Sequence, residues 1–329
     1  MKKYPMLLRP VSKEIIWGGD RLRREYGKTA PFDKIAESWE LTVREKEMCV
    51  IASGEYTGLP LGAYIRARRR SVLGKDGAKY DRFPLLIKFI DAADRLSIQV
   101  HPDNEYGLKN EGELGKTEMW YIMAAEEGAK LVYGLKEGCT VEEFGAAVAE
   151  GRTEELLNFV EVHPGETYFI PSGQVHAIGA GILIAEIQQN SNITYRVYDY
   201  NRPGADGKPR ELHTAKALDV IKLRTKEEID AIRFAVPLSG VKADNMEVLA
   251  SCEYFTVVKY ATDAGSTAQF DVTDHSFASV LVLDAAEDAQ LESGDQIYPL
   301  HKGESYFLPA GLGEVRVAGK ADIIVSEVN

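Results

Sequence analysis

Short apolar runs recur along most of the chain, and each is rich in β-branched and aromatic residues and bounded by Gly, Pro, Asp or Asn. Such runs are typical of β-strands. The predicted strands cover residues 84–90, 96–100, 119–123, 168–170 and 181–187, and in the last third residues 254–260, 277–283, 304–308 and 321–325. Many short strands at this spacing predict a mainly β protein built from sandwich or jelly-roll units.

Helical patterns are few. They predict helices at residues 61–73, 140–150, 153–159 and 212–222, of which the second opens on a capping box formed by Thr140 and Glu143. The strand spacing pauses around residues 225–240, which indicates a boundary between two domains. We therefore divide the chain into residues 1–235, with a short helical segment at about 135–160, and residues 236–329.

One phrase, G-x5-P-x-G-x2, occurs twice in the chain. Its first copy begins at Gly165 and leads to His176, and its second begins at Gly303 and leads to Glu314. Ordered self-similarity of this kind indicates a duplicated supersecondary unit. Because the final residue changes from His to Glu, we expect a ligand in the first copy and a structural domain without metal in the second.

Composition narrows the classes of function. The 329 residues are enough for two domains, and 45% hydrophobic with 27% charged residues is typical of a soluble globular protein. The net charge of −12 argues against non-specific binding to nucleic acid or an anionic membrane, although local Arg and Lys residues can still bind an anionic substrate. Three widely spaced cysteines, no signal peptide and no apolar stretch approaching ~20 residues predict a reduced, cytoplasmic protein.

A set of metal-ligating residue types falls on three of the predicted strands. Gln99 and His101 share one strand face because successive side chains alternate, Glu118 opens the next strand, and His176 follows the repeated phrase. Two imidazoles, a carboxylate and an amide oxygen suit Zn²⁺ best, with Mn²⁺ and Fe²⁺ as alternatives. The spacing alone leaves two interpretations open, a divalent metal site and histidines held by structural hydrogen bonds.

The segment from Gly165 to His176 resembles the second cupin motif, and Gln99-x-His101 followed by Glu118 resembles a variant of the first, with Gln in place of the usual first His. The wider sequence resembles type I mannose-6-phosphate isomerases of the short bacterial form. The segments that carry this resemblance cover residues 17–19, 37–40, 96–103, 115–120, 189–202 and 212–221.

The resemblance implies two cupin-like units, the first of them catalytic. It implies one zinc ion per chain, and it assigns as ligands Gln99, His101, Glu118 and His176. It also implies a small phosphorylated hexose as substrate, interconversion of mannose 6-phosphate and fructose 6-phosphate through an enediol, and Arg196 as the catalytic arginine. We expect a monomer or a small homo-oligomer.

Further candidate residues follow from their places near the ligands. Lys116 lies two residues before Glu118, so strand alternation turns it toward the same face, where it could contact substrate oxygens or assist proton transfer. Glu186 could line the cleft or pair with a basic neighbour. Ser97 shares the face of the first ligands and could bind the phosphate, and Arg202 is another phosphate candidate that could equally lie on the surface.

Two other functions fit a cupin. An oxygenase would use Fe²⁺ and require O₂, and a sugar-binding or regulatory cupin would carry out no chemistry. The Gln99 ligand and the Arg196 segment match the isomerases instead, and the complete set of ligand types argues against a non-catalytic role.

Overall fold

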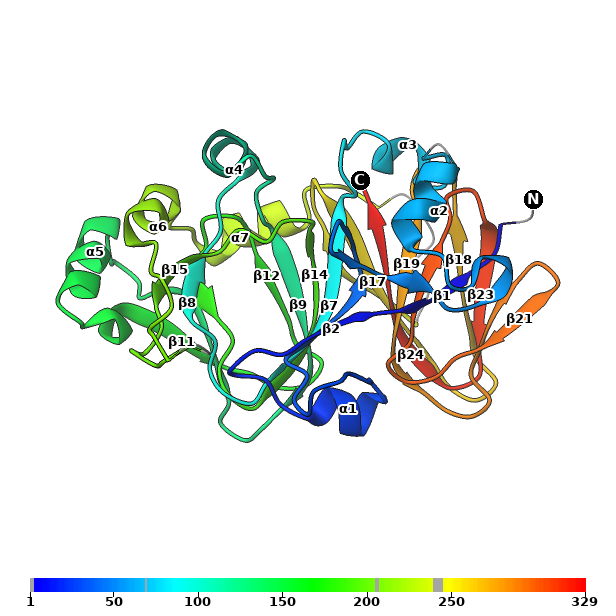
Figure 1. Ribbon diagram of the computed structural model, residues 1–329, viewed down its shortest axis with the longest axis horizontal. Coiled ribbons are helices and arrows are strands. Elements are labelled where there is room, and N and C mark those ends of the chain that lie inside the picture. Colours follow the sequence, from blue (N-terminus) through cyan, green and yellow to red (C-terminus); the bar gives the residue numbers. More distant parts are fainter. Residues whose placement is uncertain (1–2, 69, 205–206, 239–244) are drawn as a thin grey trace.

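The computed structural model describes residues 3–68, 70–204, 207–238 and 245–329, and its mainly β architecture confirms the predicted fold class. Two β units lie side by side along the long axis of the molecule (Figure 1). The first unit contains the cyan and green strands, and the second contains the orange and red strands of the last third of the chain. Helices lie mainly at the periphery.

Two antiparallel sheets form the first unit. The larger sheet has the order β12 (Thr167–Ile170), β9 (Glu118–Ala125), β14 (Ile182–Gln189), β7 (Leu85–Ala92), β3 (Glu37–Leu41) and β2 (Val11–Lys13). The smaller sheet has the order β11 (Leu157–Glu161), β10 (Lys130–Leu135), β13 (His176–Ala177), β8 (Ile98–Val100) and β15 (Tyr195–Tyr198).

Two further antiparallel sheets form the second unit. The larger has the order β16 (Met246–Ser251), β17 (Phe255–Thr262), β24 (Ala321–Val328), β19 (Ala278–Ala285), β22 (Ser305–Leu308), β1 (Met6–Arg9) and β6 (Val50–Ile51). The smaller has the order β18 (Thr267–Val272), β23 (Gly313–Ala318), β20 (Gln290–Ser293) and β21 (Gln296–Pro299). A short hairpin joins β4 (Val43–Arg44) and β5 (Glu47–Met48).

The strand orders of the two units agree. The run β12-β9-β14-β7-β3 of the first unit corresponds to β22-β19-β24-β17-β16 of the second, and β11-β10-β13-β8 corresponds to β21-β20-β23-β18. The repeated phrase makes the same turn in both. In the first unit Glu166 accepts hydrogen bonds from the backbone of His163 (2.9 Å) and the hydroxyl of Tyr168 (3.0 Å). The same two bonds, at 3.0 and 2.8 Å, join the corresponding residues His301, Glu304 and Tyr306.

The N-terminal segment connects the two units. β1 pairs with β22 of the second unit, where Met6 lies opposite Phe307, whereas β2 pairs with β3 of the first unit. β1 therefore belongs to the large sheet of the second unit, and the chain enters the first unit at β2. The division between residues 235 and 236 stays a prediction, and residues 239–244 of the predicted boundary region lie outside the described part of the chain.

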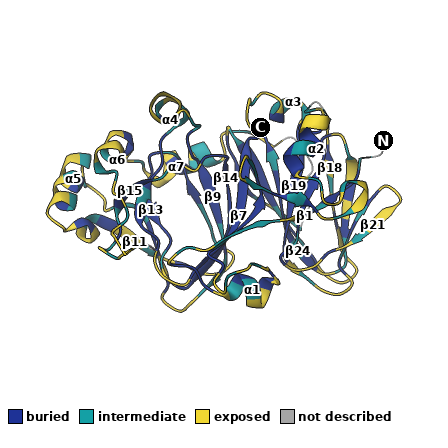
Figure 2. Ribbon diagram, viewed as in Figure 1, coloured by how far each residue is buried: buried dark blue, intermediate teal, exposed yellow. Residues whose placement is uncertain are grey.

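The largest hydrophobic core lies between the two large sheets. In β7 the side chains of Leu85, Ile87 and Phe89 pack into this shared layer, and the alternate residues face the interior of the first unit. All eight residues of β7 are consequently buried. Figure 2 shows the same pattern as dark blue strands at the centre and exposed segments at the periphery. A polar residue placed on the alternate face of β7 is therefore buried inside the first unit.

The helices agree only partly with prediction. The described helices are α1 (Arg21–Tyr26), α2 (Leu61–Ala67), α3 (Gly74–Gly77), α4 (Asn104–Glu111), α5 (Val141–Ala149), α6 (Thr214–Val220) and α7 (Lys226–Arg233), with 3-10 turns at Gly54–Tyr56 and Thr153–Leu156. The predicted capping box of Thr140 and Glu143 opens α5. Residue 69, inside the helix predicted at 61–73, lies outside the described residues.

The helix predicted at 153–159 is wrong beyond its first turn, because β11 begins at Leu157 and pairs with β10. Tertiary pairing at a sheet edge outweighs the local helical pattern there. A second capping box, formed by Thr225 and Glu228, opens α7 in the segment that we predicted as a domain boundary. Within the described residues, no helix combines the length and the apolar composition needed to cross a membrane.

Candidate metal centre and active site

Three strands of the first unit bring the predicted ligands together. His176 on β13 lies directly opposite Gln99 on β8, and His101 follows the end of β8. Glu118 opens β9, opposite Ile170 at the end of β12, where the repeated phrase turns toward β13. The sheet pairing alone therefore places one end of this turn opposite Glu118 and the other end opposite Gln99.

Gly173 makes this turn possible. Its φ of 87° is a left-handed conformation that side chains rarely adopt, and a Cβ here would lie 2.8 Å from the carbonyl oxygen of Val220. Its N–H donates a hydrogen bond to the carbonyl of His101 at 2.8 Å. The glycine of the repeated phrase thus joins the loops that carry the two histidines.

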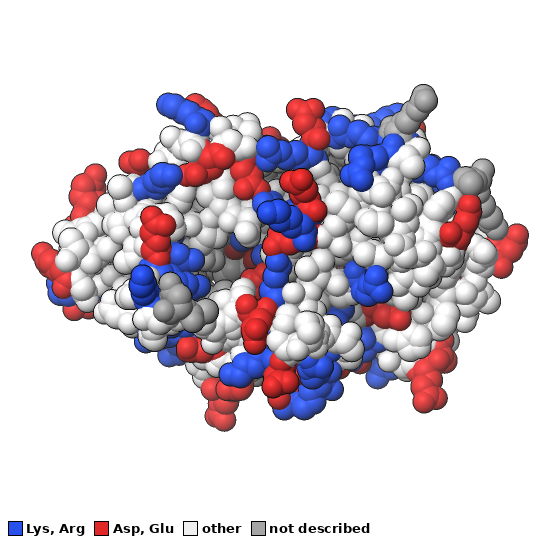
Figure 3. All heavy atoms as spheres, viewed as in Figure 1, with Lys and Arg blue, Asp and Glu red and all other residues white. Residues whose placement is uncertain are grey.

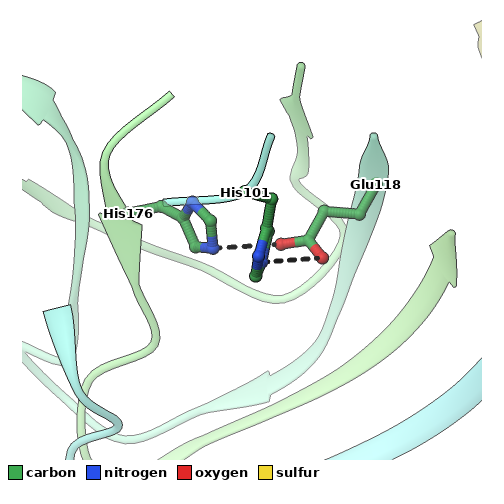
Figure 4. A group of neighbouring side chains, drawn as sticks. All are labelled: His101, Glu118 and His176. Atoms are coloured by element: carbon green, nitrogen blue, oxygen red, sulfur yellow. Dashed lines mark ion pairs between the residues drawn. The ribbon is translucent and has the colours of Figure 1, made fainter. Parts of the chain in front are cut away.

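The side chains of His101, Glu118 and His176 converge in the interior of the unit (Figure 4). The Nε2 atom of His176 lies 3.3 Å from Oε1 of Glu118, and the Nε2 atom of His101 lies 3.7 Å from its Oε2. One candidate ligand atom from each residue lies within 4.8 Å of the others, and all three residues are buried. This separation matches three donors around one small cation.

Both imidazoles are oriented by their other nitrogen. Nδ1 of His101 lies 2.7 Å from the carbonyl oxygen of Ile193, and Nδ1 of His176 lies 2.8 Å from that of Gln174. A carbonyl only accepts, so each Nδ1 carries the proton and each Nε2 presents a lone pair to the cluster. Nε2 of His101 and Oε1 of Glu118 are buried without a hydrogen-bond partner, whereas Oε2 of Glu118 lies 2.7 Å from the ammonium of Lys116. Since buried polar atoms normally have hydrogen-bond partners, lone pairs that lack one are suited to bind a cation.

Burial also sets the protonation of the cluster. It lowers the pKa of His176 to about 3 and holds the pKa of His101 well below its usual range, with repulsion from Lys116 acting in the same direction. Both rings are therefore neutral at neutral pH, as metal ligands must be. Burial raises the pKa of Glu118 to about 7 although Lys116 lies 2.7 Å away, so a further cation would favour its carboxylate form.

The fourth predicted ligand is a neutral amide. Nε2 of Gln99 lies 3.3 Å from Nε2 of His176. Rotation about the Cγ–Cδ bond exchanges the amide nitrogen for its oxygen, which is the atom that can bind a metal. Gln99 is thus placed to complete a set of two nitrogens and two oxygens, a donor combination that suits Zn²⁺.

A cleft of about 320 Å³ opens beside the cluster, within the size range of small-molecule sites. Four of the predicted catalytic and substrate-binding residues line it, namely Ser97, Lys116, Glu186 and Arg196. Arg202 is not among its described lining residues, because its guanidinium binds Asp199 at 2.9 Å and Asp94 at 3.1 Å. The structure gives Arg202 a role in anchoring a loop, and its contact with substrate stays a prediction.

The sequence reasoning missed Lys88 in this cleft. Lys88 lies on the alternate face of β7 and is 4% exposed, and its Nζ is 3.0 Å from Glu186 and 3.6 Å from Glu37. Trp120 donates a hydrogen bond of 3.0 Å to the other oxygen of Glu186. Burial by itself would raise the pKa of Glu186, but Lys116 and Lys88 outweigh it and lower the pKa to about 2. A lysine inside the otherwise apolar run Leu85–Ile90 was the signal that could have revealed this pair.

The second unit has other residue types at the positions that correspond to these donors and to the buried ion pair. The strand register places Asp271, Thr273, Ala278 and Glu314 where the first unit has its four donors. Where the first unit has Lys88, Glu186 and Trp120, the second has Val258, Val325 and Val280. Three valines fill the space with apolar atoms, and Glu314 instead accepts a hydrogen bond from Gln269 at 2.8 Å.

Two jelly-roll units with matching strand orders, and a convergent set of imidazole, carboxylate and amide donors inside one of them, define a cupin with a candidate metal site. Comparisons with known proteins identify the family. Residues 6–128 match the phosphomannose isomerase type I catalytic domain, and residues 245–328 match the mannose-6-phosphate isomerase cupin domain.

Individual relatives cover the whole chain. It is 38% identical to the mannose-6-phosphate isomerase ManA of Bacillus subtilis (strain 168), with 100% of both chains covered. It is also 38% identical to the mannose-6-phosphate isomerase of Streptococcus mutans serotype c, covering 99% of this chain and 98% of that one. A crystal structure of the Bacillus subtilis mannose 6-phosphate isomerase matches with a TM-score of 0.86 at 36% identity, over 98% of this chain and 99% of that chain. The chain belongs to the type I phosphomannose isomerase family, and it is an isomerase.

Proposed function

We propose that this enzyme interconverts mannose 6-phosphate and fructose 6-phosphate through an enediol, with one zinc ion bound by Gln99, His101, Glu118 and His176. The convergence of buried donor atoms without hydrogen-bond partners, beside a cleft of about 320 Å³, carries the proposal. Its cytoplasmic location and its monomeric or small homo-oligomeric state belong to the same proposal.

The reaction moves a proton between C1 and C2 and develops negative charge on the sugar oxygens. Zinc, when bound, supplies Lewis-acid polarisation of these oxygens. Lys116, 2.7 Å from Glu118, presents an ammonium to the cleft and is the proposed carrier of protons to and from substrate oxygens. Glu186 is held as a carboxylate by Lys88 and Trp120, which suits it to position these two side chains against the substrate.

Arg196 supplies positive charge next to the donor set. It lies opposite Gln99 on the neighbouring strand and lines the cleft, and its Nη1 donates to the carbonyl of Glu211 at 2.8 Å. Its Nε is buried without a hydrogen-bond partner. A fixed guanidinium with an unused donor is suited to stabilise the enediolate as its charge develops.

Metal removal tests the proposed function. We expect about one zinc per chain by elemental analysis, loss of anaerobic isomerisation on chelation, and recovery when zinc is returned. Activity that survives complete metal removal would contradict the proposal. Bound iron together with oxygen consumption would instead indicate a cupin oxygenase.

Arg196→Ala separates charge stabilisation from metal binding. We expect zinc content to stay unchanged and kcat to fall by roughly 10²- to 10³-fold, which is the usual effect of removing one donor to a developing oxyanion. Arg316→Ala is the matched control, since Arg316 is a strand arginine of the second unit, 3.5 Å from Glu292. Normal turnover by the Arg196 variant would refute its assignment.

A further inference from the structure

A loop borders the cleft between Arg196 and His213. The backbone N–H of His213 donates to the carbonyl of Arg196 at 2.7 Å, which closes the base of the loop, and a β-bridge joins Pro203 to Pro209. Arg95 stacks over the ring of Tyr200 at 3.5 Å, which ties the loop to the segment before β8. Figure 3 shows basic side chains gathered beside a hollow on this face of the molecule.

Two arginines of the loop share one buried carboxylate. Arg210 binds Asp199 through two parallel bonds, from Nε at 2.7 Å and from Nη2 at 2.6 Å. Arg202 also binds Asp199, at 3.1 and 2.9 Å, and extends away to Asp94. The side chain of Asp199 is only 5% exposed, so the carboxylate fixes the direction of both guanidinium groups.

Only one of these two arginines faces the substrate cleft. Arg210 lines it together with Arg196 and Ser97, whereas Arg202 is held by its two carboxylates. The Nη1 group of Arg210 makes no hydrogen bond to any described residue. The fork with Asp199 thus leaves one donor group of a cleft-lining arginine without a hydrogen bond to the described residues.

The charge balance of the cleft differs between its two ends. Beside the donor set, Lys116 pairs with Glu118 and Lys88 pairs with Glu186, so the positive charges are compensated. At the loop, Arg202 and Arg210 share the buried carboxylate of Asp199, and the second partner of Arg202, Asp94, is largely exposed. The buried carboxylate of Asp199 therefore does not balance both guanidinium groups, and a doubly charged anion is favoured at this end of the cleft.

We propose that Arg210, seated by Asp199, is the specificity-determining contact for the phosphate of the substrate. This inference rests on the proposed function, because it concerns a phosphorylated sugar in the same cleft. A guanidinium matches the planar spacing of two phosphate oxygens, and Ser97 adds a neutral donor that lines the same cleft. The phosphate then lies at the loop, and C1 and C2 lie toward the four donors. Arg202 acts through Asp199 as an anchor of the loop.

Arg210→Gln tests the assignment in the zinc-loaded enzyme. We expect the KM for mannose 6-phosphate, and the inhibition constant of inorganic phosphate, to rise by roughly 10- to 100-fold, as expected for lost charge-assisted hydrogen bonds. Zinc content and kcat at saturation should change by less than about threefold. Arg152→Gln is the control, since Arg152 pairs on the surface with Glu150 and Glu155.

Asp199→Asn tests the positioning role. It keeps the side-chain shape and removes the charge, so we expect a smaller rise in KM with kcat retained, and Asp199→Glu should recover part of the loss. If Arg210→Gln does not fold, Arg210→Lys keeps the charge without the fork and should still raise KM. Unchanged KM and phosphate inhibition in folded Arg210 variants would overturn the inference. If the wild-type protein has no isomerase activity but binds inorganic phosphate, and Arg210→Gln abolishes that binding, the proposed function is wrong and the phosphate contact is supported.

Discussion

His176→Ala should lose both its metal and its activity. His176 is fully buried, and its Nε2 points into the cluster because Gln174 accepts from its Nδ1. Loss of partners outside a coordination sphere already costs about 10- to 100-fold in metal affinity or activity, so loss of a ligand should cost more than ~100-fold. Elemental analysis and steady-state kinetics on the same preparation check this result.

The duplication supplies a matched control for this variant. Glu314→Ala changes the residue at the same place of the repeated phrase in the second unit, where its side chain accepts a hydrogen bond from Gln269. We expect it to keep zinc and turnover. If both variants lose metal equally, the loss reflects general unfolding and the assignment of His176 as a ligand is wrong.

Lys88→Val should destabilise the protein strongly as well as inactivate it. The variant leaves Glu186 buried at 2% exposure without its closest cation. Removal of one member of a buried ion pair costs about 3–5 kcal/mol, because the other charge remains desolvated. Denaturant unfolding of the metal-free proteins would measure the difference in unfolding free energy.

The second unit indicates which further substitution should restore the unfolding free energy of Lys88→Val. Val258 and Val325 occupy the corresponding places there, so Lys88→Val combined with Glu186→Val should recover most of the stability and none of the activity. A double variant less stable than Lys88→Val would contradict this account of the pair.

The stability deficit of Lys88→Val should also depend on pH. In the wild type the pKa of Glu186 is depressed to about 2, so its stabilising contribution is present above the unfolded value of ~4.3 and is lost as pH falls toward 2. Without Lys88, burial is less opposed and the pKa rises, so the ionised form costs stability at higher pH. The deficit should therefore shrink as pH falls from about 7 to 4, and a deficit independent of pH would contradict an electrostatic origin.

Local pattern predicted the strands well because each strand is a short apolar run with polar boundaries. The strand predicted at 181–187 corresponds to β14, and that predicted at 321–325 corresponds to β24. The helix predicted at 153–159 is wrong beyond its first turn because residues from Leu157 onward pair with β10. This pairing is a tertiary contact that the local sequence pattern does not report. The same limit applies to β1, whose partner β22 lies almost 300 residues away.

Residue types and their spacing by themselves determined the candidate metal ligands. They also determined that the two copies of the repeated phrase differ at their final residue, His176 or Glu314. Gln99, His101, Glu118 and His176 could be named because strand alternation and a glycine-dependent turn are local properties. Only the tertiary structure decided which charges share the cleft. It brought Lys88 to Glu186 from different strands, and it turned Arg202 away while directing Arg210 inward. Ion pairs across a folded interior depend on sheet register and loop closure, which are set by contacts between residues far apart in the chain.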